Sequence, residues 1–218
     1  MCGRYAFAFR EAGRFSRVMV DVLEGVEDNY NISPTSIVPV YLQDGWKMMR
    51  WGLIPVWSKE PTSKYATFNA RSDSLMQKPT FRSAWKHGHR CLIPATGYYE
   101  WKQQGTKKTP YFITSVYDEP LVFAGLWDRW QGTESELFSC TIITCDSDGV
   151  LKEIHDRKPL MLEPDLAGNW IHGDLDAALE ILEGPALPDV VFYPVSQLVG
   201  NPRNHGAELI RPVDDNAS

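Results

Sequence analysis

The chain has 218 residues, of which 43% are hydrophobic and 23% are charged, and its formal net charge is −6. Its apolar runs all fall short of the roughly 20 residues that a membrane-spanning helix needs, so we expect a soluble protein with no membrane partner. Four cysteines without a secretory leader favour a reducing, cytoplasmic compartment and argue against a disulfide framework. The negative net charge, taken alone, argues against a nucleic-acid partner.

The charge is unevenly distributed along the chain. Between Lys64 and Lys108 nine residues are basic and two are acidic, which gives a local charge of +7 and leaves −13 for the remainder. A positive face on an acidic body can bind a polyanion, because the local potential governs that encounter. A solvated basic face without a partner explains the same numbers, so charge alone leaves both interpretations open.

The first part of the chain predicts a helix and a hairpin. Apolar residues recur at helical spacing over residues 15–23, and Gly25 follows as a natural stop. Residues 37–42 and 46–51, joined by an Asp-Gly turn, predict a β-hairpin. Its first arm contains Pro39, which lacks a backbone donor, so we expect that arm to be an edge or bulged strand.

Short runs rich in aromatic and β-branched residues dominate the middle of the chain. Turn-forming residues separate consecutive runs, and such tight connections indicate antiparallel pairing, since a parallel pair needs a long crossover. The predicted strands cover residues 90–94, 98–102, 111–116, 121–127 and 137–144.

The C-terminal third predicts a short helix after Ser147, a helix capped by Asp174 that ends at Gly184, and a late strand over residues 190–195. We therefore expect an α+β fold in which a mainly antiparallel sheet or open barrel-like core is flanked by short helices. We expect one domain over residues 1–213 and a polar tail over residues 214–218.

The start of the chain, Met1-Cys2-Gly3-Arg4, carries unusual chemistry. An initiator methionine is removed when the second side chain is small, so we expect the mature chain to begin with Cys2. Its α-amine, whose pKa is about 7.7 to 8.0, can then form an imine with an aldehyde, and its thiolate can close a thiazolidine on the same carbon. The plain alternative is that Cys2 is only a small residue after the initiator.

Three further motifs carry residues suited to catalysis. Asn69 and Arg71 are two apart and share a face if their segment is extended. Glu100 lies among tyrosines and tryptophan, whose desolvating effect would raise the pKa of its carboxyl and suit a proton shuttle. His155 lies beside an acid and two cations. Each has a structural alternative: a turn or cap for Asn69, an exposed cross-strand pair for Glu100 and a polar helix terminus for His155.

The other cysteines do not suggest a metal centre. Cys140 and Cys145 are five apart rather than in Cys-x-x-Cys spacing, and Cys91 lies in an apolar run, so we expect buried thiols, no metal and no cofactor. The chain contains no phosphate-binding glycine loop, no Gly-x-Ser-x-Gly elbow and no His-Glu-x-x-His helix, which excludes several common enzyme classes.

Taken together, these motifs closely resemble the SRAP family, named for SOS-response-associated peptidases. The resemblance spans almost the whole chain and outweighs the structural alternatives for Cys2, Asn69, Glu100 and His155. The motifs are Met-Cys-Gly-Arg at residues 1–4, Asn-Ile-Ser-Pro at 31–34, Trp-Gly-Leu-Ile-Pro at 51–55 with Trp57, Asn-Ala-Arg at 69–71, Gly-Tyr-Tyr-Glu-Trp at 97–101, Ile-His-Asp-Arg-Lys-Pro at 154–159 and Gly-Ala-Glu-Leu-Ile at 206–210.

The resemblance implies a DNA-damage protein that binds single-stranded DNA and attaches itself covalently to abasic sites, shielding them from strand cleavage. A ring-opened abasic sugar presents an aldehyde, the electrophile that an N-terminal aminothiol captures. The family pattern makes Cys2 the nucleophile, Asn69 the group that holds the amine and the sugar, Glu100 the proton shuttle and His155 a contact to the opened sugar.

The resemblance also implies DNA contacts and secondary activities. Arginines suit phosphates, and Trp57 offers a surface for base stacking. An abasic-site lyase activity and autoproteolytic removal of Met1 by Cys2 and Glu100 are further expectations, as is a monomeric state. The implied DNA-binding residues are Arg4, Asn31, Ser33, Pro34, Trp57, Arg71 and Arg157, with Thr144 lining the same pocket.

Two other functions stay open at this point. The chain could be an N-terminal-nucleophile peptidase that acts on proteins, or a non-covalent reader of modified DNA bases. A heat-stable crosslink to abasic DNA that depends on Cys2 would separate the covalent function from both alternatives.

Overall fold

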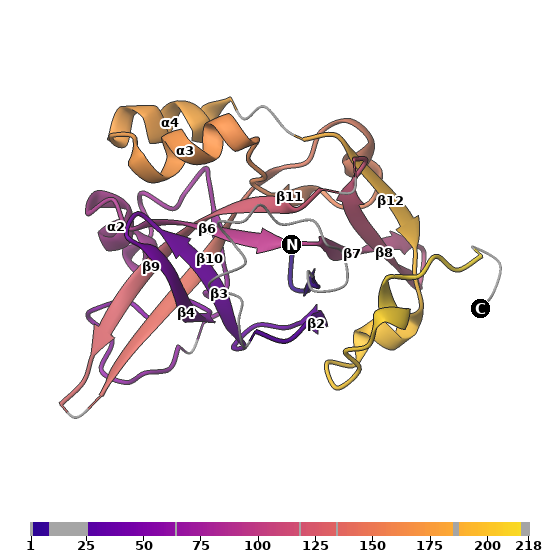
Figure 1. Ribbon diagram of the computed structural model, residues 1–218, viewed down its shortest axis with the longest axis horizontal. Helices are drawn as coiled ribbons and strands as arrows, with labels where there is room; N and C mark the ends of the chain where they lie inside the picture. Colours follow the sequence, from indigo (N-terminus) through magenta and orange to yellow (C-terminus); the bar gives the residue numbers. More distant parts are fainter. Residues whose placement is uncertain are drawn as a thin grey trace.

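The computed structural model describes residues 2–8, 26–63, 65–117, 119–133, 135–184 and 188–214. Two sheets form its centre (Figure 1). The first has the strand order β12-β8-β7-β1-β2 and consists of β1 (Tyr5–Phe7), β2 (Asn29–Ile32), β7 (Gly97–Gln104), β8 (Lys107–Ser115) and β12 (Val190–Pro194).

The second sheet closes on itself as a barrel. Its order is β11-β10-β4-β3-β6-β9, and an additional β9–β10 pairing joins the two ends of the run from β10 to β9. Its strands are β3 (Ile37–Leu42), β4 (Gly45–Trp51), β5 (Asn69–Arg71), β6 (Arg90–Ala95), β9 (Leu121–Gln131), β10 (Glu136–Asp146) and β11 (Arg157–Pro159).

The helical elements are short and lie outside the two sheets (Figure 1). The Asp174 carboxylate accepts a hydrogen bond of 2.9 Å from the Ala177 N–H and caps its helix as expected. The elements are α2 (Pro79–Lys86), α3 (Pro164–His172), α4 (Leu175–Glu183) and the 3₁₀ turns η1 (Gly149–Glu153), η2 (Gln197–Gly200) and η3 (Ala207–Ile210). In the described part of the chain, no helix has the length and apolar character to cross a bilayer.

The α+β class and the predicted strands from β6 to β10 are confirmed, as are the β3–β4 hairpin, the 3₁₀ turn after Ser147, helix α4 and strand β12. The barrel is not wholly antiparallel, because β10 pairs in parallel with both β4 and β5. The helix predicted over residues 15–23 lies outside the described residues.

The expectation that Pro39 makes its strand an edge or bulged strand is wrong. Strand β3 lies between β4 and β6, and its register with β4, in which Pro39 is opposite Met48, is unbroken from Ile37 to Leu42. The pairing between β3 and β6 is limited to Tyr41 and Leu92, two residues beyond the proline. An inner strand tolerates the missing N–H here because the proline lies outside the short stretch paired with β6.

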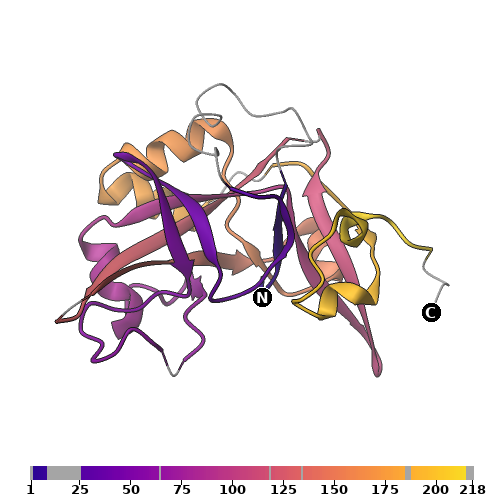
Figure 2. The ribbon, with the colours of Figure 1, turned by 60° about the horizontal axis from the view of Figure 1, so that its bottom comes forward.

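The buried side chains form three clusters. These lie between helices α2 to α4, the barrel, the first sheet and the turns η2 and η3. Alternate residues of the barrel strands and one face of the first sheet share the largest cluster, which includes Tyr5, Trp51 and Phe123. A second cluster lies between the barrel and helices α2 to α4, where the ring centres of Trp85 and Trp170 are 6.3 Å apart. The third joins the outer face of the first sheet to η2 and η3, on the C-terminal side of the molecule in Figure 2.

Candidate active site

Cys2 is a core residue at the junction of the barrel and the first sheet. Its side chain is fully buried in the largest cluster, and its thiol lies 3.8 Å from the carbonyl oxygen of Arg4. Burial raises the pKa of the Cys2 thiol well above its usual value, and the negative charge of Glu100 raises it further. The thiol is therefore protonated at neutral pH.

Asn69 holds the main chain of Cys2. Its Nδ2 donates a 2.7 Å hydrogen bond to the Cys2 carbonyl oxygen. The strand register agrees with this placement: β5 pairs with β10 so that Asn69 is opposite Ile142, which belongs to the same core cluster as Cys2. The Asn69 Oδ1 is buried without a hydrogen bond in the described part of the chain. This side chain joins two residues that are 67 positions apart in the sequence.

Glu100 reaches the same junction from the first sheet. Tyr98 and Glu100 are two apart on β7 and therefore share a face, and Tyr98 packs in the cluster that contains Cys2. Glu100 is 5% exposed, and its charge acts on both the Cys2 thiol and the Tyr98 hydroxyl. The carboxylate therefore lies close enough for its charge to act on the thiol.

His155 follows η1, which borders the same region. Leu151 and Ile154 pack in the cluster with Cys2, and Lys102 on the Glu100 face of β7 lies 3.8 Å from Glu153. The His155 Nδ1 accepts a 3.0 Å hydrogen bond from the Arg157 N–H. The proton of a neutral His155 ring is therefore on Nε2, and Nδ1 is the acceptor.

Thr144 lies on β10 between β5 and β11. It is opposite Arg71 on one side and Pro159 on the other, on the same strand face as Ile142. Its hydroxyl is buried and makes no hydrogen bond within the described chain. The Thr144 hydroxyl and the Asn69 amide oxygen are thus two buried polar atoms without a hydrogen bond in the described chain. Both lie on the side of the barrel that faces the cluster with Cys2.

Two arginines beside this strand are paired with carboxylates. The Arg71 side chain is 55% exposed and binds Asp73 at 2.6 Å, which lowers the pKa of that carboxyl. The buried Arg157 contacts Asp146 and Asp73, and its Nη2 donates a 2.7 Å hydrogen bond to the Thr144 carbonyl oxygen. The four side chains form one network at the border of the site, in which each cation already has an anionic partner.

Arg4 and Asn31 bind another part of the molecule. The Arg4 guanidinium donates to Asn31 Oδ1 at 2.8 Å and to the carbonyl oxygens of Val199 and Gly200. The Asn31 amide in turn donates to the carbonyl oxygens of Val199, Asn201 and Asn204. These two side chains fasten the first strands to the segment around η2, and the structure does not place them with Arg71 and Arg157.

The remaining predicted DNA contacts lie in loops. Ser33 and Pro34 are half-buried in the turn between β2 and β3, where the Ser33 carbonyl oxygen accepts a 3.2 Å hydrogen bond from the Ser36 N–H. Trp57 is 60% exposed in the loop after β4, and its Nε1 donates to the Pro79 carbonyl oxygen at 3.3 Å. The indole therefore presents a large apolar surface to solvent.

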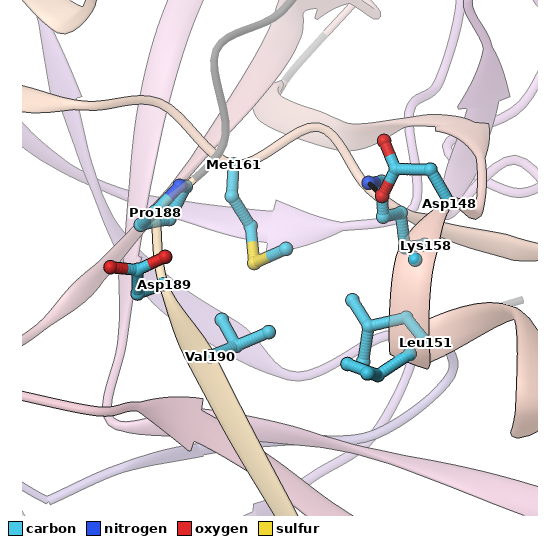
Figure 3. A pocket seen from close by; sticks show the side chains of 9 residues that line it. Asp148, Leu151, Lys158, Met161, Pro188, Asp189 and Val190 are labelled. Atoms are coloured by element: carbon cyan, nitrogen blue, oxygen red, sulfur yellow. Dashed lines mark hydrogen bonds and ion pairs between the residues drawn. The ribbon is translucent and has the colours of Figure 1, made fainter.

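A pocket of about 220 Å³ lies near the site but contains none of the predicted residues (Figure 3). In it, the Lys158 Nζ lies 2.5 Å from Asp148, and Met161 and Val190 supply apolar walls. A chemical role does not follow from this space, because the cation is already neutralised. Within the described residues, no group of three His, Cys, Asp or Glu side chains is arranged to hold a metal ion.

Sequence reasoning assigned no role to the acidic partners of the arginines. Asp73 is two residues after Arg71, a spacing that indicates a pair on an extended or turning segment. Asp146 and Arg157 are not close in the sequence, but they are opposite each other in the antiparallel pairing of β10 and β11. That partnership becomes visible only once the pairing of the three-residue strand β11 is known.

The SRAP family model, described as SOS response associated peptidase, matches residues 1–202. The chain belongs to this family. It is 34% identical to the abasic site processing protein YoqW of Bacillus subtilis, over 96% of this chain and 99% of that one. It is 32% identical to the abasic site processing protein YedK of Escherichia coli, over 98% and 100% of the two chains.

Solved structures of other proteins share the fold. A protein from Bacteroides thetaiotaomicron aligns with a TM-score of 0.80 and 25% identity, over 97% of this chain and all of the other. A phage-related protein from Bordetella bronchiseptica aligns with a TM-score of 0.67 and 29% identity, over 90% and 95% of the two chains. The arrangement of barrel, second sheet and short helices is thus the fold of this SRAP member.

Proposed function

We propose that this protein recognises abasic sites in single-stranded DNA and captures them as a covalent thiazolidine on Cys2. The supporting relatives are abasic site processing proteins by name. The observation that carries the proposal is the joint placement of Cys2, Asn69 and Glu100: the amide fixes the Cys2 main chain at 2.7 Å, and the carboxylate acts electrostatically on the thiol.

The reaction needs the α-amine of Cys2, and therefore the loss of Met1. The neutral amine attacks the aldehyde carbon of the ring-opened sugar, and the resulting carbinolamine loses its hydroxyl as water to give an imine. The Cys2 sulfur then adds to the imine carbon while its proton moves to the former imine nitrogen. One C–N bond and one C–S bond form, and one water leaves.

In this proposal Glu100 moves the protons. It delivers a proton to the departing hydroxyl and accepts the thiol proton, so that the sulfur attacks as a thiolate although burial favours the thiol. Asn69 limits the motion of the residue that carries both nucleophiles, which holds the amine and the sulfur on one carbon of the substrate. His155 contacts the opened sugar, and Thr144 lines the same pocket.

DNA binding in this proposal uses the exposed Arg71, the indole of Trp57 and the buried Arg157 as the nearest groups to the site. A phosphate can replace or share the carboxylate partners of the two arginines, because both anions fit a guanidinium fork. Arg4, Asn31, Ser33 and Pro34 complete the proposed contacts, and the monomer suffices as the acting unit. Lyase activity is a secondary outcome, since a protonated imine acidifies the neighbouring C2′ hydrogen.

The proposal is tested by incubating the purified protein with an abasic single-stranded oligonucleotide and separating the products on a denaturing gel. We expect a heat-stable shifted band for the wild type and none for Cys2→Ala. Cys2→Ser keeps the amine without the sulfur, so it should give only an adduct that borohydride reduction traps. Intact mass of each sample reports whether Met1 is present.

Each alternative predicts a different result in the same assay. Binding of abasic DNA without any Cys2-dependent band would support a non-covalent reader. Cleavage of unrelated peptides that is lost in Cys2→Ala would support an N-terminal-nucleophile peptidase. Retention of Met1 in Glu100→Gln, with its removal in the wild type, would support autoproteolytic processing.

A further inference from the structure

Helix α2 carries a row of cations that the proposed chemistry does not use. Lys78 precedes the helix at its N-cap, and Arg82 and Lys86 follow at intervals of four residues. All three side chains are exposed. Residues four apart in a helix lie on one side of it and about 6 Å apart along its axis, so the three charges form a line.

Packing fixes the direction in which this row points. Phe81 and Trp85 on the neighbouring face are buried in the cluster between the barrel and the helices. Helix α2 cannot rotate its cations inward without exposing these rings. The row is therefore a permanent part of the surface, on the outer side of the barrel next to α3 and α4 in Figure 1.

The stretch of chain that carries the row contains only basic charges. The sequence contains no aspartate or glutamate between Asp73 and Glu100. Neither Lys78, Arg82 nor Lys86 forms an ion pair with a described residue, whereas Arg71 and Arg157 both do. Within the described residues, an external anion can therefore meet these three charges without displacing a carboxylate partner.

The row begins beside the exposed indole of Trp57. The Trp57 Nε1 donates to the carbonyl oxygen of Pro79, the first residue of α2. A tight turn connects this point to the site, because the Leu75 N–H bonds to the Arg71 carbonyl and the Lys78 N–H to the Ser74 carbonyl. The site strand β5 is thus connected by a short turn to α2. The exposed Trp57 ring lies at the start of α2, and the three cations follow along the helix.

We propose that α2 binds the phosphate backbone of the single strand that flanks the captured nucleotide, continuing its path beyond Trp57. An aromatic platform followed by evenly spaced cations is the arrangement that binds single strands without reading their sequence. The outer face of α2 has charges where a protein partner would need an apolar centre, which favours nucleic acid over an acidic protein surface. This inference rests on the proposed function and extends its DNA site.

The test neutralises the row and compares it with an equal loss of charge elsewhere. The triple variant Lys78→Gln, Arg82→Gln, Lys86→Gln is measured beside Lys107→Gln, Lys108→Gln, Arg211→Gln, which removes three exposed cations from β8 and the C-terminal segment. Binding of undamaged single-stranded oligonucleotides is followed by fluorescence anisotropy at several salt concentrations. Thermal unfolding of both variants checks that each is folded.

We expect the α2 variant to weaken the slope of log affinity against log salt by about 2, since each contact to a single strand contributes about 0.7. The control variant should change that slope by less than one contact's share. With abasic oligonucleotides extended on the 5′ or the 3′ side, the wild type should crosslink faster on one extended strand, and the α2 variant should lose that advantage while keeping the rate on the shortest strand.

Equal salt slopes for both triple variants would overturn the inference, as would an unchanged preference for the extended strand. Either result, with a normal wild-type crosslink, leaves the proposed function standing. Absence of any crosslink in the wild type would instead contradict the proposed function, and the salt slopes with undamaged strands would still decide the role of α2. Binding of an acidic peptide but not of DNA by the row would also contradict it.

Discussion

Cys2 combines two properties that rarely occur in one residue. It is the proposed nucleophile, and it is also one of the fully buried members of the main core cluster. Burial keeps the thiol protonated until a base accepts its proton, which protects it from reagents in solution. The α-amine has an ordinary pKa of about 7.7 to 8.0, so in the proposed reaction the nitrogen attacks first and the sulfur closes the ring afterwards.

The charge of Glu100 sets part of the thiol's acidity. In Glu100→Gln the negative charge that raises the Cys2 pKa is gone, so thiolate should form at lower pH than in the wild type, although burial still keeps the pKa above its usual value. Alkylation of the N-terminal peptide, followed by mass spectrometry across pH 7 to 10, should show a curve displaced toward lower pH.

The same variant should crosslink more slowly, because the proton shuttle is lost. Glu153→Gln is the matched control, since it removes one exposed carboxylate from nearby η1 and should leave the alkylation curve in place. A curve that stays fixed in Glu100→Gln, or moves to higher pH, would contradict the assigned electrostatic contact.

Asn69 tests the importance of holding the Cys2 main chain. Asn69→Ala removes the 2.7 Å hydrogen bond to the Cys2 carbonyl, and a bond of this kind contributes about 1 kcal/mol, so crosslinking should slow by roughly fivefold. Asn69→Asp keeps the shape but points a carboxylate at the same carbonyl and should be at least as slow. Affinity for undamaged strands should stay within about twofold; a parallel loss of affinity would make Asn69 a DNA contact instead.

At the scale of elements, short strands do most of the positioning. The three residues of β1 carry the chain from Cys2 into the first sheet, and β1 pairs with β7 through Tyr5–Tyr98 and Ala6–Gly97. This pairing brings the start of the chain beside the strand that holds Glu100. A glycine is needed in that register, because a Cβ at Gly97 would lie 2.4 Å from Phe112 and 2.5 Å from the Ile113 carbonyl oxygen.

Gly97→Ala should therefore destabilise the protein by about 1 to 3 kcal/mol through overpacking, and it should slow crosslinking by displacing β1 from β7. Gly168→Ala is the opposite control: the position is within α3 and has open space around it, so alanine should stabilise the helix by about 0.5 to 1 kcal/mol. Urea unfolding of both variants checks the signs, and equal stabilities would refute the packing argument.

The sequence predicted the long strands of the middle region because each is a run rich in aromatic and β-branched residues between turn residues. It missed β5 and β11, which are only three residues long and owe their existence to pairing with the distant β10. It also missed α2 and α3, whose eight and nine residues are too short for a clear period. Two of these short elements carry Asn69, Arg71 and Arg157.

The sequence motifs named candidate site residues but did not give their geometry. The ordered motifs indicated Cys2, Asn69 and Glu100, and the structure brings these three together. The clamp made by Arg4 could not be predicted, because its partners are backbone carbonyls 195 and 196 positions away, and a carbonyl leaves no mark in a sequence pattern. The turn between Arg71 and α2 could not be predicted either, because backbone hydrogen bonds form it.

For the whole molecule, the segment around η2 acts as a strap over the first sheet. Val199 packs against Ala6 and Tyr99, while Arg4 and Asn31 bond to the strap's carbonyl groups. The face of the sheet opposite the main core is thereby covered, and the strand that begins at Tyr5 is held from both sides. These contacts on both faces of the first sheet hold the start of the chain in place.

Asn31→Ala removes three hydrogen bonds to this strap and one from Arg4. Because four hydrogen bonds are lost in a mostly buried place, we expect a loss of about 2 to 3 kcal/mol and a melting temperature lower by several degrees. Asn201→Ala, an exposed side chain of the strap, should change the melting temperature little. Unchanged melting of Asn31→Ala together with weaker DNA binding would assign Asn31 to the DNA interface rather than to the strap.

The burial of Cys2 has a practical consequence for anyone who prepares this protein. An affinity tag that remains joined to this residue would turn its amine into an amide and would also force extra chain out of a packed interior. Handles for purification, dyes or surface attachment therefore belong at the C-terminal end, since Asp214 is exposed. A preparation with an N-terminal tag would show no crosslinking because of the tag and not because of the protein's own chemistry.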